Sequence, residues 1–369
     1  MKVEERRTHV QYWLRTKLNR AKILNEEHFS KLIDRDTISE ILTDLIETNA
    51  KGFRGVVVTS LAGFSIDKDF NPLINFYACN PRSIFEQAIW YVLTEYKIPC
   101  GKSDPLNVAK NITKLDMDWA KDRRPERAAV AAVKFLTLCV NEENLGQRML
   151  LEDYFYFKLI QYASKIAKFD LASPDTDSKP RQWLAAELVQ FSLEAPESGA
   201  TPQLLVACLL KEIFKTGDVL VCGGDESVFG TNTTSKKPAD IWLELNGASS
   251  VLFEITLKKV DIKRLEDCIE AHHVLEILDL PLTFICRIPE DIATLVNVRE
   301  NTLHYKNRKF EFCDYSNFVR SSFSLIDDDG VGKVYGNMHA FVQRVTTSFK
   351  AKEAWNRILA GSTAVADNP

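Results

Sequence analysis

The residues best suited to chemistry lie in one segment, PADIWLELNGASSVLFEITLK, at residues 238–258. Its two halves alternate apolar and polar residues and flank an Asn-Gly pair, which favours a hairpin turn. Asp240 in the first half and Glu254 in the second fall on the faces opposite the apolar residues. Carboxylates are the hard oxygen ligands that Mg²⁺ prefers, and Mg²⁺ takes its other ligands from water and substrate phosphate. The segment is therefore suited to a magnesium site that acts on a phosphate.

The length of the loop between the two strands decides how these acids face each other. Residues directly opposite in an antiparallel pair have numbers with a constant sum, which for Asp240 and Glu254 is 494. A three-residue loop gives that sum, and a five-residue loop makes the two acids diagonal neighbours, about 7–8 Å apart at the backbone. A two-residue loop would put them on opposite faces, which the apolar pattern excludes.

Thr256 and Lys258 share the face of Glu254 if the second strand continues through them. A lysine beside a magnesium site orients or activates the attacking water, and a hydroxyl group positions it. The alternative is a solvated hairpin whose charges are ordinary surface residues. The residue pattern by itself favours neither interpretation.

The order of elements around the hairpin resembles the PD-(D/E)xK nuclease superfamily, whose core contains an Asp strand followed by a (D/E)xK strand. Residues 238–240 match the first motif with one alanine inserted, and residues 254–256 match the second with threonine in place of lysine. The resemblance implies that Asp240, Glu254 and the carbonyl of Ile255 hold Mg²⁺, with Lys258 supplying the missing charge. It also implies a third acidic ligand on the upstream helix, where Glu187 is the candidate. The alternative for Glu187 is an exposed helix residue.

Two further segments look similar to SacI-type restriction endonucleases: IPCGKSDPLNVAKNITKLDMDWAKDRRPERAA at residues 98–129 and SGATPQLLVACLL at residues 198–210. The resemblance implies a type II enzyme that cuts double-stranded DNA at a short palindromic site. It further implies a homodimer with Mg²⁺ as cofactor and a cognate DNA methyltransferase in the same restriction-modification system. Two alternatives are a nuclease without strict sequence specificity and a non-catalytic DNA-binding protein that keeps the nuclease fold.

The composition of the chain is compatible with DNA binding but does not require it. The 369 residues are 45% hydrophobic and 27% charged with a net charge of −4, which excludes a disordered chain and a histone-like, uniformly basic binder. Basic residues are nevertheless concentrated around the proposed site, where the acids Asp240, Glu244, Glu254 and Asp261 are outnumbered by Lys236, Lys237, Lys258, Lys259, Lys263 and Arg264. The loop TNTTSKK at 231–237 also offers hydroxyl, amide and amino donors to phosphate. Two other basic clusters lie at residues 121–127 and 306–309.

The elements that must position these residues form two parts. Residues 1–175 read mainly as helix, with one strand expected at Gly55–Leu61, and are interpreted as a DNA-recognition or dimerisation domain. A linker, LASPDTDSKP at residues 171–180, leads into a catalytic domain at residues 176–360. That domain reads as helices, a β-meander and then alternating helix and strand, which predicts an α/β (α+β) fold with a restriction-endonuclease-like mixed sheet flanked by helices. The segment GVGKVYG at 330–336 lacks the Walker spacing and is read as a turn.

Cysteine usage and hydropathy indicate the compartment. No run of eighteen apolar residues exists, so no membrane span is expected, and the polar amino terminus is unlike a signal peptide. The eight cysteines contain no CxxC pair and most lie in apolar runs, as buried free thiols do. The expected location is the cytoplasm.

Overall fold

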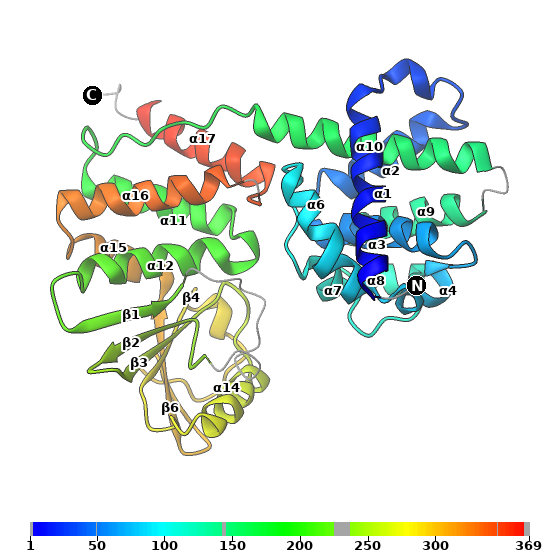
Figure 1. Cartoon of the computed structure of the whole chain (residues 1–369). Coiled ribbons are helices and arrows are strands. Elements are labelled where there is room, and N and C mark those ends of the chain that lie inside the picture. Colours follow the sequence, from blue (N-terminus) through cyan, green and yellow to red (C-terminus); the bar gives the residue numbers. More distant parts are fainter. Residues whose placement is uncertain (1–2, 49, 142–144, 225–236, 345, 365–369) are drawn as a thin grey trace. The chain divides into compact units, whose positions relative to one another are not determined.

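The computed structural model describes residues 3–48, 50–141, 145–224, 237–344 and 346–364. Two compact units make up the chain, Met1–Asp170 and Leu171–Pro369, so the division falls at the start of the expected linker. Figure 1 shows helices throughout the first unit and a sheet with helices in the second. Each unit is considered by itself.

The first unit is built from helices in the part of the chain that the structure describes. Short 3₁₀ or π turns at Glu26–Phe29, Phe76–Cys79 and Phe85–Ile89 lie between them. The α-helices are α1 (Val3–Ile23), α2 (Arg35–Ile46), α3 (Lys51–Ile66), α4 (Pro72–Asn75), α5 (Pro81–Ile84), α6 (Trp90–Glu95), α7 (Asp104–Val108), α8 (Met117–Lys121), α9 (Glu126–Asn141) and α10 (Leu145–Ala167).

The strand expected at Gly55–Leu61 is wrong, because these residues lie in the middle of α3. Every residue from Gly52 to Phe64 is buried, and a helix buried on all sides has the continuous apolar run that also suits a buried strand. Gly55 allows close packing, since a Cβ there would lie 2.4 Å from the Cγ of Pro105. No helix in the described parts of the chain is long and apolar enough to cross a bilayer.

The second unit contains a six-stranded mixed sheet with the order β1-β2-β3-β4-β6-β5. Strands β1, β2 and β3 form an antiparallel meander, β4 and β6 run parallel to β3, and β5 pairs antiparallel with β6. The strands are β1 (Val219–Gly223), β2 (Ile241–Leu245), β3 (Ala248–Ile255), β4 (Leu282–Cys286), β5 (Thr302–Tyr305) and β6 (Arg308–Asp314). The expected α+β class with a mixed sheet is confirmed.

Helices cover both faces of this sheet (Figure 1). Side chains such as Ile241 and Ile255 enter a core shared with α11, α12, α15, α16 and α17, whereas Leu252 and Phe284 enter a second core with α14. The helices are α11 (Arg181–Glu194), α12 (Ala200–Ile213), α14 (Ile262–Val274), α15 (Tyr315–Phe323), α16 (Asp328–Gln343) and α17 (Phe349–Ala364), with 3₁₀ turns at Glu197–Gly199 and Glu290–Ile292. Side chains on the face of the sheet that α14 covers are therefore buried between the sheet and this helix.

The turn expected at residues 330–336 is also wrong, because this segment lies inside α16. Asp327 caps the helix by accepting a hydrogen bond from the N–H of Gly330 at 2.8 Å. Val331, Val334 and Tyr335 recur at helical spacing and are buried, and this periodicity outweighs the three glycines.

Candidate active site

The β2–β3 hairpin places Asp240 and Glu254 directly opposite each other, but not through the expected loop. The turn has two residues, Asn246 and Gly247, whose positive φ values of 54° and 78° fit a type I′ turn. Ser250 then forms a bulge, since Leu243 pairs with Val251 whereas Glu244 pairs with Ser249. The bulge changes the register by one residue, so the final pair is Ile241 with Phe253 and the next step along the ladder faces Asp240 with Glu254.

The expectation that a two-residue loop excludes this arrangement is therefore wrong. A turn of two residues alone would separate the acids onto opposite faces, and the extra residue at Ser250 returns them to one face. The Ser250 hydroxyl donates to the Leu243 carbonyl at 3.1 Å and stabilises the bulge from within.

The two carboxylates differ in their surroundings. Asp240 is half-buried and its Oδ2 accepts a hydrogen bond from the N–H of Ile255 at 3.0 Å, which draws its side chain across to β3. Glu254 is buried, with 5% of its surface exposed, on the sheet face that α14 covers. The acids expected to form the site are thus brought together at the end of β3.

Electrostatics at this pair favour a bound cation. Burial raises the pKa of Asp240, and the negative charge of Glu254 raises it further, to about 8, although the Ile255 N–H and the Arg264 guanidinium act in the opposite direction. Asp240 is therefore largely protonated at neutral pH, because two adjacent carboxylates resist ionising together. A divalent cation would relieve this repulsion and displace the proton.

The donor set fits a hard cation that keeps several waters. Among the described residues, no group of three or more His, Cys, Asp or Glu side chains is positioned to hold a metal ion. Two carboxylates and the main-chain carbonyl of Ile255 remain, and Mg²⁺ is commonly bound by one or two carboxylates with water and phosphate oxygens completing its shell.

The main chain around Asp240 is fixed by residues that sequence reasoning did not identify. The Asp240 carbonyl accepts hydrogen bonds from the Gly224 N–H at 3.1 Å and from the Gln203 side-chain amide at 3.2 Å. His272 of α14 hydrogen-bonds through Nε2 to the Pro238 carbonyl, and burial lowers the pKa of His272 to about 4, which keeps the ring neutral. Gln203 and His272 lie far from Asp240 in sequence, so no local signal points to them.

Replacing Gly224 by alanine is expected to destabilise the second unit by about 2 kcal/mol or more. Gly224 has a φ of +83°, and a Cβ there would lie 2.2 Å from the Cβ of Ala207 on α12. Gly247→Ala is the matched control, since Gly247 has a φ of +78° but nothing within 4 Å of the added Cβ. Urea unfolding should show a larger loss for Gly224→Ala, and equal losses would contradict the close approach of β1 to α12.

The residues that follow β3 do not continue its face as expected. The strand ends at Ile255, and Lys258 lies in a bend with an exposed side chain. Thr256 is buried, and its Oγ1 accepts hydrogen bonds from the Lys258 N–H at 3.1 Å and from Arg264 at 3.2 Å. Arg264 also lies 3.3 Å from Oε2 of Glu254. Arg264 rather than Lys258 thus places a positive charge at Glu254, because the chain bends after Ile255 and continues into α14.

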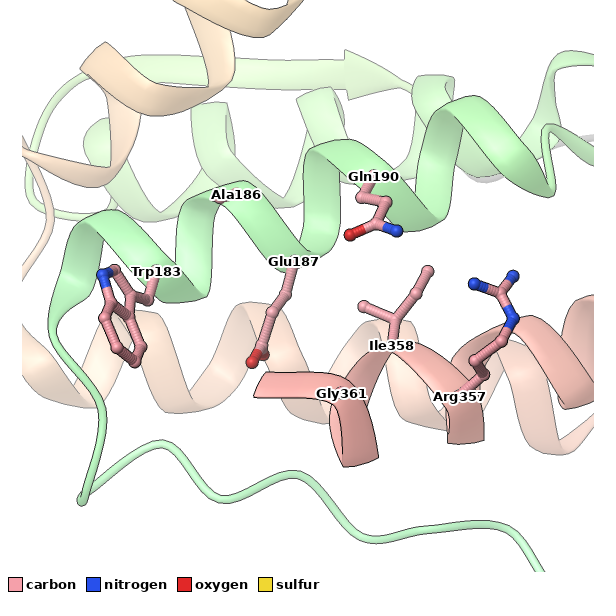
Figure 2. Close-up of a pocket in the computed structure, with 7 residues that line it drawn as sticks. All are labelled: Trp183, Ala186, Glu187, Gln190, Arg357, Ile358 and Gly361. Carbon is pink, nitrogen blue, oxygen red and sulfur yellow. The ribbon is translucent and has the colours of Figure 1, made fainter. Parts of the chain in front are cut away.

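Glu187 lies in a different cluster. It is buried on α11, where Lys179 is 2.6 Å from its Oε1 and the Tyr335 hydroxyl donates to its Oε2 at 2.7 Å. Figure 2 shows its side chain directed toward α17, at a pocket of about 400 Å³. The pocket is lined by Trp183, Ala186, Glu187, Gln190, Arg357, Ile358 and Gly361.

The structure therefore does not bring Glu187 to the hairpin acids. Both of its oxygens have partners, and neither Asp240 nor Glu254 lines its pocket. Helical spacing explains the position, since residues 183, 186, 187 and 190 share the face of α11 that packs against α17. The alternative of an exposed residue is wrong as well.

No protein-family model matches the chain, and no curated protein is significantly similar to it in sequence. The similarity to SacI-type enzymes therefore stays an expectation. The Asp240–Glu254 pair and the charges around it are the features of the chain that bear on its function.

Proposed function

We propose that this protein is a Mg²⁺-dependent endonuclease that hydrolyses phosphodiester bonds of double-stranded DNA. The observation that carries the proposal is the position of Asp240 beside Glu254, one step beyond the last strand pair, with the pKa of Asp240 raised to about 8 by burial and by the charge of Glu254. A carboxylate pair that keeps a proton at a pH where a free aspartate is ionised has a strong affinity for a positive charge.

The residues of the pair have defined roles in this proposal. Asp240, Glu254 and the Ile255 carbonyl hold Mg²⁺, which when bound polarises the phosphoryl group and makes its water more acidic. Thr256 has its hydroxyl fixed by Lys258 and Arg264, so it is placed to orient a water molecule next to Glu254. Lys258 is exposed beyond the strand and is assigned to the phosphate backbone of the substrate.

Three exposed lysines beside the site support a nucleic-acid substrate. Lys258, Lys259 and Lys263 form no ion pair within the described part of the chain; the first two lie just after β3, and Lys263 is the second residue of α14. The other basic clusters are largely compensated, as in the pairs Lys121–Asp118, Lys306–Glu266 and Lys309–Glu311. Residues 231–236 of the loop expected to contact phosphate lie outside the described residues. Three lysines without an ion pair in the described residues thus lie close in sequence to Glu254.

Changing Lys258, Lys259 and Lys263 together to glutamine is expected to weaken DNA binding by on the order of tenfold or more near physiological salt. Each phosphate contact contributes roughly 0.9 to the slope of log K against log salt concentration, so the slope should fall by about 2 to 3. The matched control is the triple glutamine variant of Lys121, Lys306 and Lys309, which removes the same charge from paired lysines. Equal slopes for both variants would contradict the assignment.

The finer proposal is a type II restriction endonuclease that acts as a homodimer at a short palindromic site, with a cognate methyltransferase. Digestion of a long, sequenced, unmethylated DNA tests it, with EDTA and Asp240→Asn controls. Discrete fragments that vanish in both controls are the expected result, and scattered cut positions would indicate an unspecific nuclease instead. Intact DNA in the presence of folded, DNA-bound protein would overturn catalysis and favour the non-catalytic DNA-binding alternative.

A further inference from the structure

Arg264 belongs to the basic cluster around the site, but the proposed function assigns it no role. It is the third residue of α14, and its main-chain N–H donates to the capping Asp261 at 2.9 Å, which fixes the start of the helix. Its guanidinium contacts Glu254 at 3.3 Å and Thr256 at 3.2 Å. The guanidinium carbon also lies 5.8 Å from the ring centre of Phe284, the residue paired with Glu254 in the neighbouring strand.

The Arg264–Glu254 ion pair is unequal in its exposure. The Glu254 side chain is 6% exposed, whereas the Arg264 side chain is 30% exposed. The ion pair therefore joins a buried carboxylate to an arginine side chain that solvent can partly reach. It also lowers the pKa of Asp240, so its charge acts on both acids.

A cation bound between Asp240 and Glu254 has to compete with this guanidinium. Both need the Glu254 carboxylate, and two positive charges a few ångströms apart repel each other. Once a divalent cation takes Glu254, the guanidinium loses its anionic partner and keeps its contact with Thr256. A guanidinium has five donors in a planar fork, which match the oxygens of a phosphate.

We infer that Arg264 is a catalytic residue: it neutralises Glu254 when no cation is bound and binds the scissile phosphate when one is. The inference rests on the proposed function and adds to it the group that stabilises negative charge developing on the phosphate. Arginine stays protonated throughout, so Arg264 contributes charge and hydrogen bonds and transfers no proton.

Arg264 competes with the metal for Glu254 but stabilises the reacting phosphate. Its loss should therefore raise the affinity for Mn²⁺ and lower the rate of DNA cleavage. Arg264→Gln should bind Mn²⁺ on the order of tenfold more tightly, since a repelling charge is gone and Glu254 is released. At saturating Mn²⁺ the same variant should cleave DNA on the order of 10²-fold more slowly, as when one stabilising donor is removed from other active sites. Arg264→Lys keeps the charge but loses the planar fork, so it should retain wild-type Mn²⁺ affinity and cleave DNA at a rate between those of the wild type and Arg264→Gln.

The test measures Mn²⁺ binding to the full chain by isothermal titration calorimetry and single-turnover cleavage of DNA. The control is Arg357→Gln, which removes another arginine–glutamate pair, with Glu194, and should leave both quantities unchanged. Weaker Mn²⁺ binding by Arg264→Gln in proportion to its loss of cleavage would overturn the inference, because a residue that only positions Glu254 predicts that result. Normal cleavage by Arg264→Gln would overturn it as well.

Failure of the proposed function gives a different result. If the wild-type protein binds Mn²⁺ and cuts no DNA, the nuclease proposal fails and the catalytic part of this inference fails with it. The Mn²⁺ affinity of Arg264→Gln then still tests whether Arg264 and the cation compete for Glu254. Tighter Mn²⁺ binding by the variant supports the competition, and unchanged binding contradicts it. If the wild-type protein binds no Mn²⁺, both proposals are wrong.

Discussion

Asp240→Asn is expected to lower the rate of Mg²⁺-dependent DNA cleavage on the order of 10³-fold or more. The same change should make the folded protein more stable at alkaline pH. Asparagine cannot ionise, so it removes a carboxylate ligand of the cation. Its Oδ1 can still accept the hydrogen bond that Asp240 receives from the Ile255 N–H. Activity and stability should therefore change in opposite directions.

The sign of the stability change follows from the raised pKa of Asp240. The folded protein holds this proton with a pKa of about 8, whereas an unfolded aspartate has a pKa of about 3.9. The stability that protonation provides is complete below the unfolded pKa and is lost as pH rises through the folded one. The advantage of Asp240→Asn over wild type should thus grow between about pH 4 and 8, to several kcal/mol, since each unit of pKa difference is worth about 1.4 kcal/mol.

Urea unfolding at pH 5 and pH 9, without divalent cations, measures this advantage. Asp291→Asn is the control, because Asp291 is a buried aspartate paired with Arg287 and its replacement should destabilise the protein. If Asp240→Asn is destabilised at both pH values, or cleaves DNA, then Asp240 is an ordinary structural carboxylate.

Glu254→Gln is expected to lower the pKa of Asp240 from about 8 toward the ordinary range of an aspartate. Glu254 is the nearby charge that raises this pKa, and its removal also leaves the Arg264 guanidinium to act on Asp240 alone. The loss of one of two carboxylate ligands should weaken Mn²⁺ binding on the order of 10²-fold and abolish cleavage.

Carbon-13 NMR of the Asp240 carboxyl group, followed through a pH titration, measures the pKa directly. Glu244→Gln provides the control on the same hairpin, since Glu244 accepts a hydrogen bond from the Trp242 indole at 2.7 Å and lies four residues from Asp240. An Asp240 pKa that moves equally in both variants would show that Glu254 has no special influence on it.

The core of the site could be predicted from sequence because strand alternation is a local property. The positions of Ile241, Phe253 and Ile255 fix which faces carry Asp240 and Glu254, and the structure has the two acids opposed. The route to that register could not be predicted. A bulge at Ser250 depends on pairing between strands, and a serine beside another serine gives no signal of it.

Contacts between residues that are far apart in sequence could not be predicted from local sequence patterns. Strand alternation predicts that Lys258 continues the face of Glu254, but β3 ends at Ile255 and the chain turns into α14, which brings Arg264 to Glu254 instead. The helical periodicity around Glu187 indicated a helix correctly without showing which of its faces meets the sheet. In α3, three consecutive valines favoured a strand, and burial on all sides of a helix overrode that preference.

Isothermal titration of the full chain with Mn²⁺ at pH 7, in buffers of different ionisation enthalpy, tests the central claim most directly. The Asp240–Glu254 pair predicts one bound cation and the release of nearly one proton per cation, because Asp240 with a pKa of about 8 must give up its proton. Asp240→Asn should bind weakly and release none. Equal binding by the variant and the wild-type protein, or binding without proton release, would contradict a cation site at this pair.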